Sequence, residues 1–205
     1  LSTIAGKECV LFITNQGIHF VDPEDGSALG NYESEFNGYR VIQPLVFDES
    51  RILLGTPMTG TECTQVTWDG ERFNTEFVWE SRRMKPYYND FVVHEGYLYG
   101  FDKDIFACVD LSNGKKQWKG GRYGHGQLLF LPANQQLLIL SEEGKLVLLR
   151  ATPEGLDELA THDALKGRTW NHPVLVGNRL FVRNGEEAAC FEVALKGEPT
   201  DSPSE

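Results

Sequence analysis

The fold is decided by the stretch Cys108-Val-Asp-Leu-Ser-Asn-Gly-Lys-Lys-Gln-Trp118. Its first four residues are a short apolar run typical of a β-strand, and residues 115–118 form the returning strand. Between them, Ser112-Asn113-Gly114 supplies turn chemistry, because glycine adopts left-handed backbone conformations at little cost. Asp110 can accept hydrogen bonds from the N–H groups of this turn, and Trp118 brings a large apolar surface to a neighbouring element. The stretch therefore predicts a β-hairpin that ends on a packing residue.

Two more strands precede this hairpin, in Phe91-Val-Val-His-Glu-Gly-Tyr-Leu-Tyr99, with a turn at Glu95-Gly96. Together they predict a unit of four antiparallel strands over residues 89–118. Similar units recur about every 40 residues, and four-stranded sheets repeated radially are the blades of a β-propeller. Continuously apolar strands such as Leu137-Leu-Ile-Leu140 fit sheets that are buried on both faces. The sequence therefore predicts an all-β fold, a β-propeller of four-stranded antiparallel blades.

Five blades are visible in the sequence, and the predicted propeller segment spans residues 1–195. We expect the first blade to lack its inner strand and the last to lack its outer strand. Residues 196–205 are polar and are predicted to be a disordered tail. Because such blades leave a ring unclosed, we expect the chain to be part of a propeller of about seven or eight blades, with the others before Leu1. The predicted blades are residues 7–36, 41–80, 87–121, 123–165 and 170–195.

Composition and charge exclude several classes of partner. The formal net charge is −11, and no basic stripe interrupts it. A phosphate backbone or an anionic membrane surface would be repelled, so we expect no nucleic-acid partner. No run approaches the roughly 18 apolar residues of a membrane span, and no positively charged, then apolar, export signal stands at the start. We therefore expect a chain that is not embedded in a membrane.

Four cysteines are present, at positions 9, 63, 108 and 190. An even number permits disulfides in a secreted protein. Each cysteine lies in an apolar, strand-like context, however, and Cys108 and Cys190 occupy equivalent repeat positions in different blades. We therefore expect buried free thiols rather than disulfides.

The repeat resembles that of the PQQ-like (quinoprotein-type) β-propellers, whose blades end in a small residue followed by x-Asp-x-x-x-Gly-x-x-x-Trp. The match is complete in the blade over residues 87–121. Six further motifs stand between residues 84 and 193, namely Gly100-Phe-Asp102, Cys108-Val-Asp-Leu111, Gly124-His-Gly126, Glu143-Gly-Lys-Leu146, Trp170-Asn-His-Pro173 and Arg183-Asn184. Through them the sequence resembles PQQ-like repeat proteins of planctomycete-type bacteria, which are similar to the propeller lipoprotein of the outer-membrane β-barrel assembly machinery. Relatives of this kind typically carry export signals, so the resemblance implies a periplasmic or extracellular location. The residues that match the repeat framework are Asp22, Gly26, Trp79, Cys108, Asp110, Gly114 and Trp118.

Aligned first strands of the predicted blades bring polar residues to equivalent positions. First strands line the central channel of a propeller, so these residues predict a polar cluster around one mouth of that channel. Two imidazoles and a carboxylate can form a set that binds a metal ion or a small ligand. The alternative without a binding function is that these polar strand ends only contact water in the channel. This alternative is favoured because the sequence has no local spacing typical of metal ligands. The six residues are Gln43, Asn89, Asp90, His125, Asn171 and His172.

Catalytic and cofactor motifs find no support in the sequence. No Gly-x-Ser-x-Gly motif occurs. PQQ enzymes use a Trp platform, acidic and amide ligands for Ca²⁺ and commonly a vicinal disulfide, and no adjacent Cys pair occurs here. The resemblance therefore implies the quinoprotein fold without its cofactor, so we expect neither PQQ nor Ca²⁺, and no catalytic residues.

Two functional hypotheses remain. The first is a non-catalytic interaction or scaffold module that binds a protein or polymer, such as a polysaccharide, or that self-associates through open blade edges. The second is a ligand-binding or metal-binding domain that uses the channel mouth, and a quinoprotein-related enzyme is one form of it. Plentiful framework residues and the lack of a catalytic set favour the first hypothesis.

Overall fold

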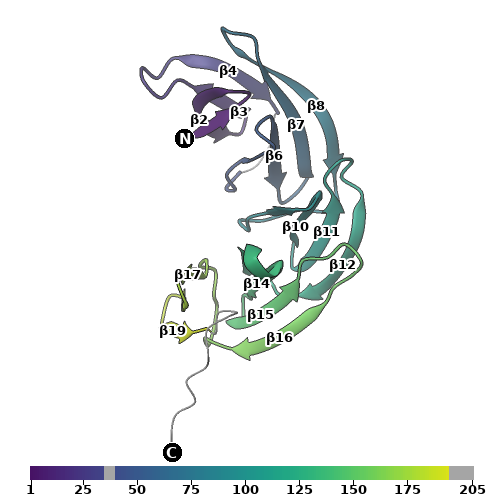
Figure 1. Ribbon diagram of the computed structural model, residues 1–205, viewed down its shortest axis with the longest axis vertical. Helices are drawn as coiled ribbons and strands as arrows, with labels where there is room; N and C mark the ends of the chain where they lie inside the picture. Colours follow the sequence, from purple (N-terminus) through teal and green to yellow (C-terminus); the bar gives the residue numbers. More distant parts are fainter. Residues whose placement is uncertain (35–39, 194–205) are drawn as a thin grey trace, which may run out of the picture. The chain divides into compact units, whose positions relative to one another are not determined.

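The computed structural model describes residues 1–34 and 40–193. Within them the chain forms five antiparallel sheets, and in each sheet the strands pair in the order in which they follow along the sequence (Figure 1). The only helical segment of these residues is a short 3-10 turn, η1 (Pro132–Asn134). The prediction of an all-β propeller with four-stranded antiparallel blades is confirmed.

We number the sheets as blades 1 to 5 in chain order. Blades 1 to 4 have four strands each within the described residues, and blade 5 has three. Blade 1 comprises β1 (Ser2–Ile4), β2 (Lys7–Thr14), β3 (Gly17–Val21) and β4 (Ala28–Glu33). Blade 2 comprises β5 (Leu45–Phe47), β6 (Arg51–Thr56), β7 (Gly60–Trp68) and β8 (Phe73–Ser81). Blade 3 comprises β9 (Val92–His94), β10 (Tyr97–Asp102), β11 (Ile105–Asp110) and β12 (Lys116–Arg122). Blade 4 comprises β13 (Gln127–Leu131), β14 (Gln136–Leu140), β15 (Lys145–Arg150) and β16 (Glu158–Asp163), and blade 5 comprises β17 (Val174–Val176), β18 (Arg179–Arg183) and β19 (Ala188–Glu192).

One irregularity fixes the repeat register in the four-stranded blades. In each of these blades, a β-bulge interrupts the pairing of the third strand with the fourth strand. The bulge follows directly after one residue pair, and this pair is equivalent in the four blades. We call the fourth-strand residue of this pair the closing residue of its blade. Each closing residue pairs with one residue of the third strand. The four pairs, with the third-strand residue first, are Phe20–Gly30, Cys63–Trp79, Cys108–Trp118 and Leu148–Ala160.

The turns of the matched repeats have the geometry that the sequence predicts. Asp110 Oδ1 accepts hydrogen bonds from the backbone N–H of Ser112 at 2.8 Å and from its hydroxyl at 2.6 Å. The corresponding carboxylate of Asp22 accepts a hydrogen bond from the Glu24 N–H at 2.9 Å. Gly26 and Gly114 both have left-handed φ angles, 75° and 69°. The Asp-to-Gly spacing is therefore a backbone requirement of this hairpin.

The expectation that the first blade lacks its inner strand is wrong. Strand β1 pairs with β2 through Ile4 and Lys7, and Ile4 is fully buried. The connection is a two-residue turn at Ala5 and Gly6, both with positive φ angles (48° and 79°). Such tight hairpins usually carry Asn-Gly or Asp-Gly, so an Ala-Gly turn behind a three-residue strand gives little sequence signal.

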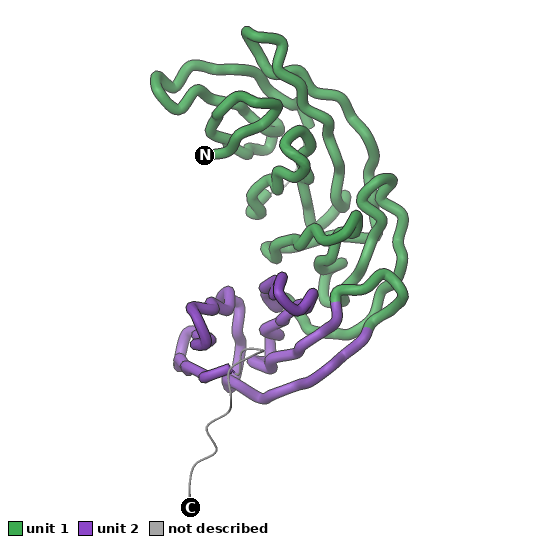
Figure 2. Tube along the Cα trace, viewed as in Figure 1, with its two compact units in different colours: residues 1–125, 151–156 green, residues 126–150, 157–205 purple. Residues whose placement is uncertain are grey.

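The described chain divides into two compact units (Figure 2). Unit 1 contains residues 1–125 and 151–156, and unit 2 contains residues 126–150 and 157–205. The hairpin at 151–156, which connects β15 to β16, thus belongs to unit 1, although its strands belong to unit 2. In unit 1, hydrophobic clusters lie between blades 1 and 2 and between blades 2 and 3, and in unit 2 a leucine-rich cluster lies between blades 4 and 5.

The ends of the chain lie partly outside this description. The predicted disordered tail, residues 196–205, falls outside the described residues, as do residues 194–195 of the last predicted blade and 35–36 of the first. Among the described residues no helix is long and apolar enough to cross a membrane.

Candidate functional site

The six predicted channel-mouth residues fall into both units. Gln43, Asn89, Asp90 and His125 belong to unit 1, and Asn171 and His172 belong to unit 2. Asn89 is completely buried, whereas Gln43, Asp90 and His172 are exposed. The ligand role of this set stays a prediction.

Within unit 1, Asn89 and His125 share a neighbour that sequence reasoning missed. The Tyr87 ring stacks on the His125 imidazole with centroids 4.8 Å apart, and the Tyr87 N–H donates to Asn89 Oδ1 at 3.1 Å. Tyr88 contacts the same imidazole edge-on at 5.6 Å. The sequence signal was an adjacent tyrosine pair directly before Asn89, outside any strand pattern.

This aromatic group, Tyr87, Tyr88 and His125, presents faces on which a planar or cationic group could stack. The alternative is that the three rings only pack against one another in a loop and bind nothing. Buried Asn89 would then serve to hold the Tyr87 backbone in place. Across residues 1–34 and 40–193, no group of three or more His, Cys, Asp or Glu side chains is arranged to hold a metal ion.

In unit 2, Asn171 and His172 directly follow Trp170, whose indole contacts side chains at the surface. The Trp170 indole N–H donates to Glu142 Oε1 at 2.9 Å, and the Arg168 guanidinium lies 5.0 Å from the ring centre. The backbone carbonyl of Trp170 accepts a hydrogen bond from the buried Gln127 amide at 3.1 Å. These contacts order the loop that leads into β17.

The framework tryptophans are used for packing between blades within unit 1. The Trp79 indole N–H donates to the Leu111 carbonyl, and that of Trp118 donates to the Thr152 carbonyl, each at 2.9 Å. The Trp79 ring also lies against the backbone of Gly114, where a Cβ atom would come within 2.6 Å of it. Each closing tryptophan therefore satisfies its one polar atom on a hairpin of the following blade.

The cysteines are free, and three of the four are buried. Burial raises the pKa of Cys63 to about 11 and that of Cys108 to about 12, which suppresses the nucleophilic thiolate. The expectation of buried thiols is confirmed for Cys9, Cys63 and Cys108 but wrong for Cys190, which is exposed. Cys190 lies on β19, the last strand of its sheet, and no strand of the described residues pairs with the outer edge of β19.

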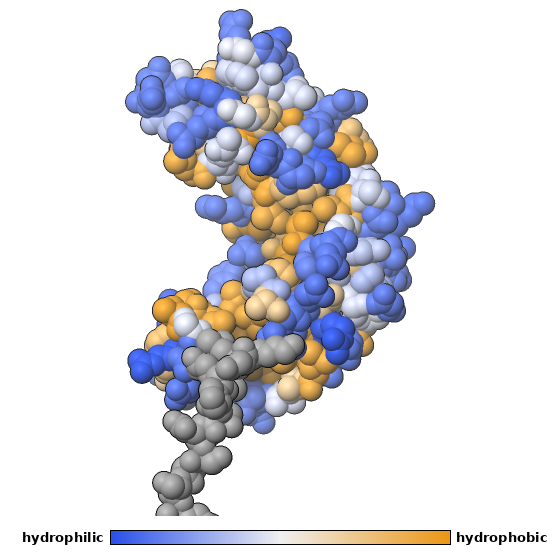
Figure 3. Space-filling view, viewed as in Figure 1, coloured by the Kyte–Doolittle hydropathy of each residue, from blue (hydrophilic) through white to orange (hydrophobic). Residues whose placement is uncertain are grey.

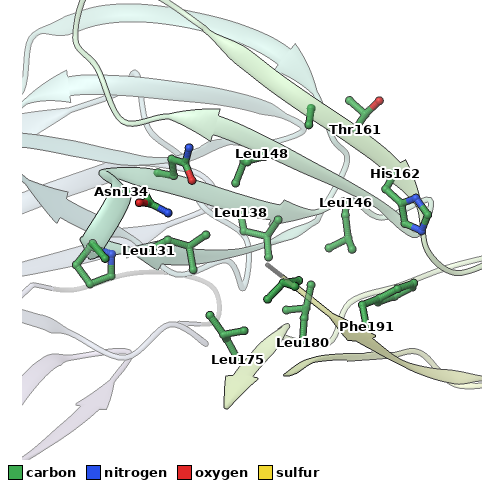
Figure 4. Close-up of a pocket in the computed structure, with 15 residues that line it drawn as sticks. Leu131, Asn134, Leu138, Leu146, Leu148, Thr161, His162, Leu175, Leu180 and Phe191 are labelled. Atoms are coloured by element: carbon green, nitrogen blue, oxygen red, sulfur yellow. The ribbon is translucent and has the colours of Figure 1, made fainter. Parts of the chain in front are cut away.

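An apolar hollow lies between blades 4 and 5 in unit 2. It has a volume of about 540 Å³. Figure 4 shows Leu131, Leu138 and Leu146 from blade 4 facing Leu175, Leu180 and Phe191 from blade 5. Towards the outer strand it is bordered by Leu148, Ala160 and His162. We call this hollow the inter-blade pocket.

Comparison with known proteins supports the fold and leaves the family open. No protein-family model matches the chain, and no curated protein matches it. Among solved structures, the computationally designed Ika8 protein matches with a TM-score of 0.61 at 10% identity, over 89% of this chain and 57% of that one. A chain of the Mitotic Checkpoint Complex matches with a TM-score of 0.66 at 11% identity, over 88% of this chain and 59% of that one. BamB from Moraxella catarrhalis matches with a TM-score of 0.50 at 14% identity, over 90% of this chain and 69% of that one.

At such low identities the likeness shows a shared fold alone. The BamB and Mitotic Checkpoint Complex chains are propeller proteins, so the propeller fold rests on these structures as well as on the sheets themselves. The chain spans less than two thirds of Ika8 and of the Mitotic Checkpoint Complex chain. The PQQ-like assignment and the likeness to planctomycete repeat proteins stay predictions.

Proposed function

We propose that this chain is a non-catalytic β-propeller module that binds a protein partner. One observation carries the proposal, namely an exposed face of blade 5 on which three apolar side chains lie beside Arg179 and Arg183. Phe181, Val174 and Val176 expose 41%, 51% and 63% of their surface. Figure 3 shows hydrophobic surface over this sheet.

The register position of Phe181 is buried in blades 2 and 3. Phe181 pairs with Cys190, as Leu53 pairs with Cys63 in blade 2 and Tyr99 with Cys108 in blade 3. Leu53 is fully buried and Tyr99 is 1% exposed. An exposed group of apolar side chains that is bordered by charged residues is a typical protein-interaction surface.

The solved structures are consistent with this role. One similar chain belongs, by its name, to a complex, and propellers serve many proteins as scaffolds. A periplasmic or extracellular location remains part of the proposal through the likeness to BamB. The proposal includes neither PQQ nor Ca²⁺. It takes a protein as the partner, and not a polysaccharide, because the side chains Val174, Val176 and Phe181 are exposed and apolar.

The test is a charge substitution on the exposed face of blade 5. Proteins retained by the wild-type chain are identified by quantitative mass spectrometry, and the best candidate is then titrated against the chain in purified form. The variant Val176→Asp/Phe181→Asp should weaken that binding at least tenfold, because each carboxylate must be desolvated in an apolar interface. The matched control, Phe77→Asp, changes a side chain of unit 1 that is 53% exposed and should bind as wild type does. Equal binding by all three chains would contradict the proposal.

The alternative function is a metal or small-ligand site at the channel mouth. The contact of Tyr87 and Tyr88 with His125 favours it. Elemental analysis of the purified chain distinguishes the two. Stoichiometric metal that is lost in His125→Ala and His172→Ala variants would replace the scaffold proposal with the ligand-site function.

A further inference from the structure

The space beside each closing residue is filled in two ways in unit 1. In blades 2 and 3 the closing residue is itself a tryptophan, Trp79 or Trp118, which packs on a hairpin of the next blade. In blade 1 the closing residue is Gly30, and the space is taken by Phe73 from the outer strand of blade 2.

The packing of Phe73 into this space is close. Its ring lies 4.6 Å from that of Phe20, the third-strand partner of Gly30, and Phe73 is only 3% exposed. A Cβ atom on Gly30 would come within 2.7 Å of the Phe73 carbonyl oxygen. Blade 1, which has no closing tryptophan, is thus completed by a large side chain from the outer strand of blade 2.

Blade 4 repeats the situation of blade 1. Its closing residue is Ala160 and the third-strand partner is Leu148, the register equivalents of Gly30 and Phe20. Both residues border the inter-blade pocket, and Ala160 is exposed. Blade 5 has no outer strand within the described residues, so no side chain stands where Phe73 stands in unit 1. The pocket lies where such a side chain would be placed.

Strand β19 offers the backbone that an outer strand would pair with. It is the last strand of its sheet, and no strand of residues 1–34 or 40–193 pairs with its outer edge. Charged residues and proline normally protect an exposed edge, but β19 has no proline and its one charged residue is Glu192 at its end. An edge of this kind binds extended peptides by adding a strand.

The charges beside this edge select the partner's chemistry. Strands β16 and β19 carry the exposed carboxylates Glu158, Asp163 and Glu192, and neither strand contains lysine or arginine. A strand added to β19 would have Glu192 as a cross-strand neighbour, on the face of β19 away from Phe191 and the pocket. It would also run beside β16, where Asp163 lies 3.8 Å from Lys145. Basic residues beside its apolar residue would be electrostatically complementary.

We propose that the inter-blade pocket and the edge of β19 bind an extended segment of a partner polypeptide. The segment pairs antiparallel with β19 as the fourth strand of blade 5. It inserts one large apolar side chain, preferably aromatic, beside Leu148 and Ala160, and carries lysine or arginine next to that residue. The proposal rests on the proposed function in that the occupant is a protein, and it names the class of segment that is bound.

The test supplies the segment from the chain's own repeat. Residues 71–81, which include β8 and Phe73, are copied and fused after Glu205 through a flexible Gly-Ser linker, so that weak binding becomes intramolecular. Hydrogen exchange of the β19 amides should slow about tenfold to a hundredfold relative to a linker-only chain, which is the range expected for burying one Phe side chain. Phe73→Ala, made only in the copy, should lose most of this protection. Replacing the copy's two glutamates in β8, Glu76 and Glu80, by lysine should increase the protection at low salt.

A second variant tests the pocket itself. Ala160→Trp places in blade 4 the side chain that blades 2 and 3 carry at this position. With Ala160→Trp, the β19 amides should be protected equally by the copy with Phe73 and the copy with Phe73→Ala, because the new indole already fills the pocket. If the β19 amides are no more protected with the copy than with the linker alone, or if Ala160→Trp leaves the Phe-dependent gain unchanged, the proposal is overturned.

Other occupants would also overturn it. Edge protection already present in the unextended chain and lost on deletion of residues 196–205 would assign the edge to the chain's own tail. Protection that rises with protein concentration, together with a dimer in sedimentation, would assign it to a second copy. A small apolar molecule that co-purifies and is displaced by Ala160→Trp would assign the pocket to a ligand. None of these results depends on the exposed face of blade 5, so failure here and failure of the proposed function are distinguishable.

Discussion

At the scale of single residues, equivalent glycines have different tasks. Gly26 and Gly114 share a register position and a left-handed φ angle. A Cβ atom on Gly26 would meet nothing within 4 Å, whereas one on Gly114 would lie 2.6 Å from the Trp79 ring. Both positions need glycine for the backbone, and Gly114 also needs it for the approach of an indole.

This difference predicts the outcome of a matched pair of substitutions. Gly26→Ala should cost about 1 kcal/mol of unfolding free energy, from the left-handed backbone alone. Gly114→Ala should cost about 1–3 kcal/mol more, because the Trp79 ring must shift. Chemical denaturation followed by tryptophan fluorescence measures both. Equal costs in the two variants would show that the Trp79 contact contributes nothing to stability.

Sequence reasoning reached only part of this picture. The Asp-to-Gly spacing is local, so it predicted the turn geometry of Asp110 and Gly114 correctly. The contact between Gly114 and Trp79 joins two blades and has no local pattern. For the same reason, Tyr87 and Tyr88 were not predicted to lie beside His125. Tyr87 stacks on His125, and the two residues are 38 positions apart in the sequence.

At the scale of elements, strand length limited the prediction. Long apolar strands such as β14 and β15 were found directly, whereas the three-residue strand β1 was missed because only Ile4 is buried in it. The exposure of Cys190 could not be read from its strand either. Its local sequence is as apolar as that of Cys108, and the two differ only in what packs against their sheets.

The β10–β11 hairpin contains a buried carboxylate whose protonation should be visible in stability. Asp102 is 4% exposed and forms ion pairs with Lys85 at 3.2 Å and Lys119 at 2.6 Å. Burial by itself raises the pKa of this carboxyl, but the hydrogen bonds from the two lysines outweigh it and hold the pKa below its ordinary value. The stabilisation is therefore present above the unfolded pKa of about 4 and is lost as the pH falls through the lower folded value.

We expect Asp102→Asn to cost about 1–3 kcal/mol at pH 7 and to flatten the loss of stability below pH of about 4. Unfolding free energies measured at several pH values test this. Asp104→Asn is the control, because Asp104 pairs with Arg122 at the surface and such pairs are worth less than about 1 kcal/mol. An Asp102→Asn variant with the same acid dependence as wild type would contradict the assigned role.

At the scale of the whole molecule, the division into two units was not visible in the sequence. Composition does not change at residue 125, and the repeat runs through it without interruption. The boundary instead follows contacts. Residues 151–156 join unit 1 because the Thr152 carbonyl accepts the Trp118 indole N–H, and because Leu156 packs against Gly120, where a Cβ atom would lie 3.3 Å from it.

This assignment predicts how local unfolding divides between the units. Leu156→Ala should speed hydrogen exchange at the β12 amides in unit 1 about tenfold and leave β17–β19 unchanged, because Leu156 packs on Gly120 of β12. Leu180→Ala removes a side chain that is 3% exposed in the leucine cluster of unit 2, a change that typically costs 2–5 kcal/mol. It should speed exchange in β17–β19 and spare β12. Each variant could instead accelerate exchange equally in β12 and in β17–β19. The chain would then open as one cooperative body, and the hairpin at 151–156 would not unfold together with unit 1 alone.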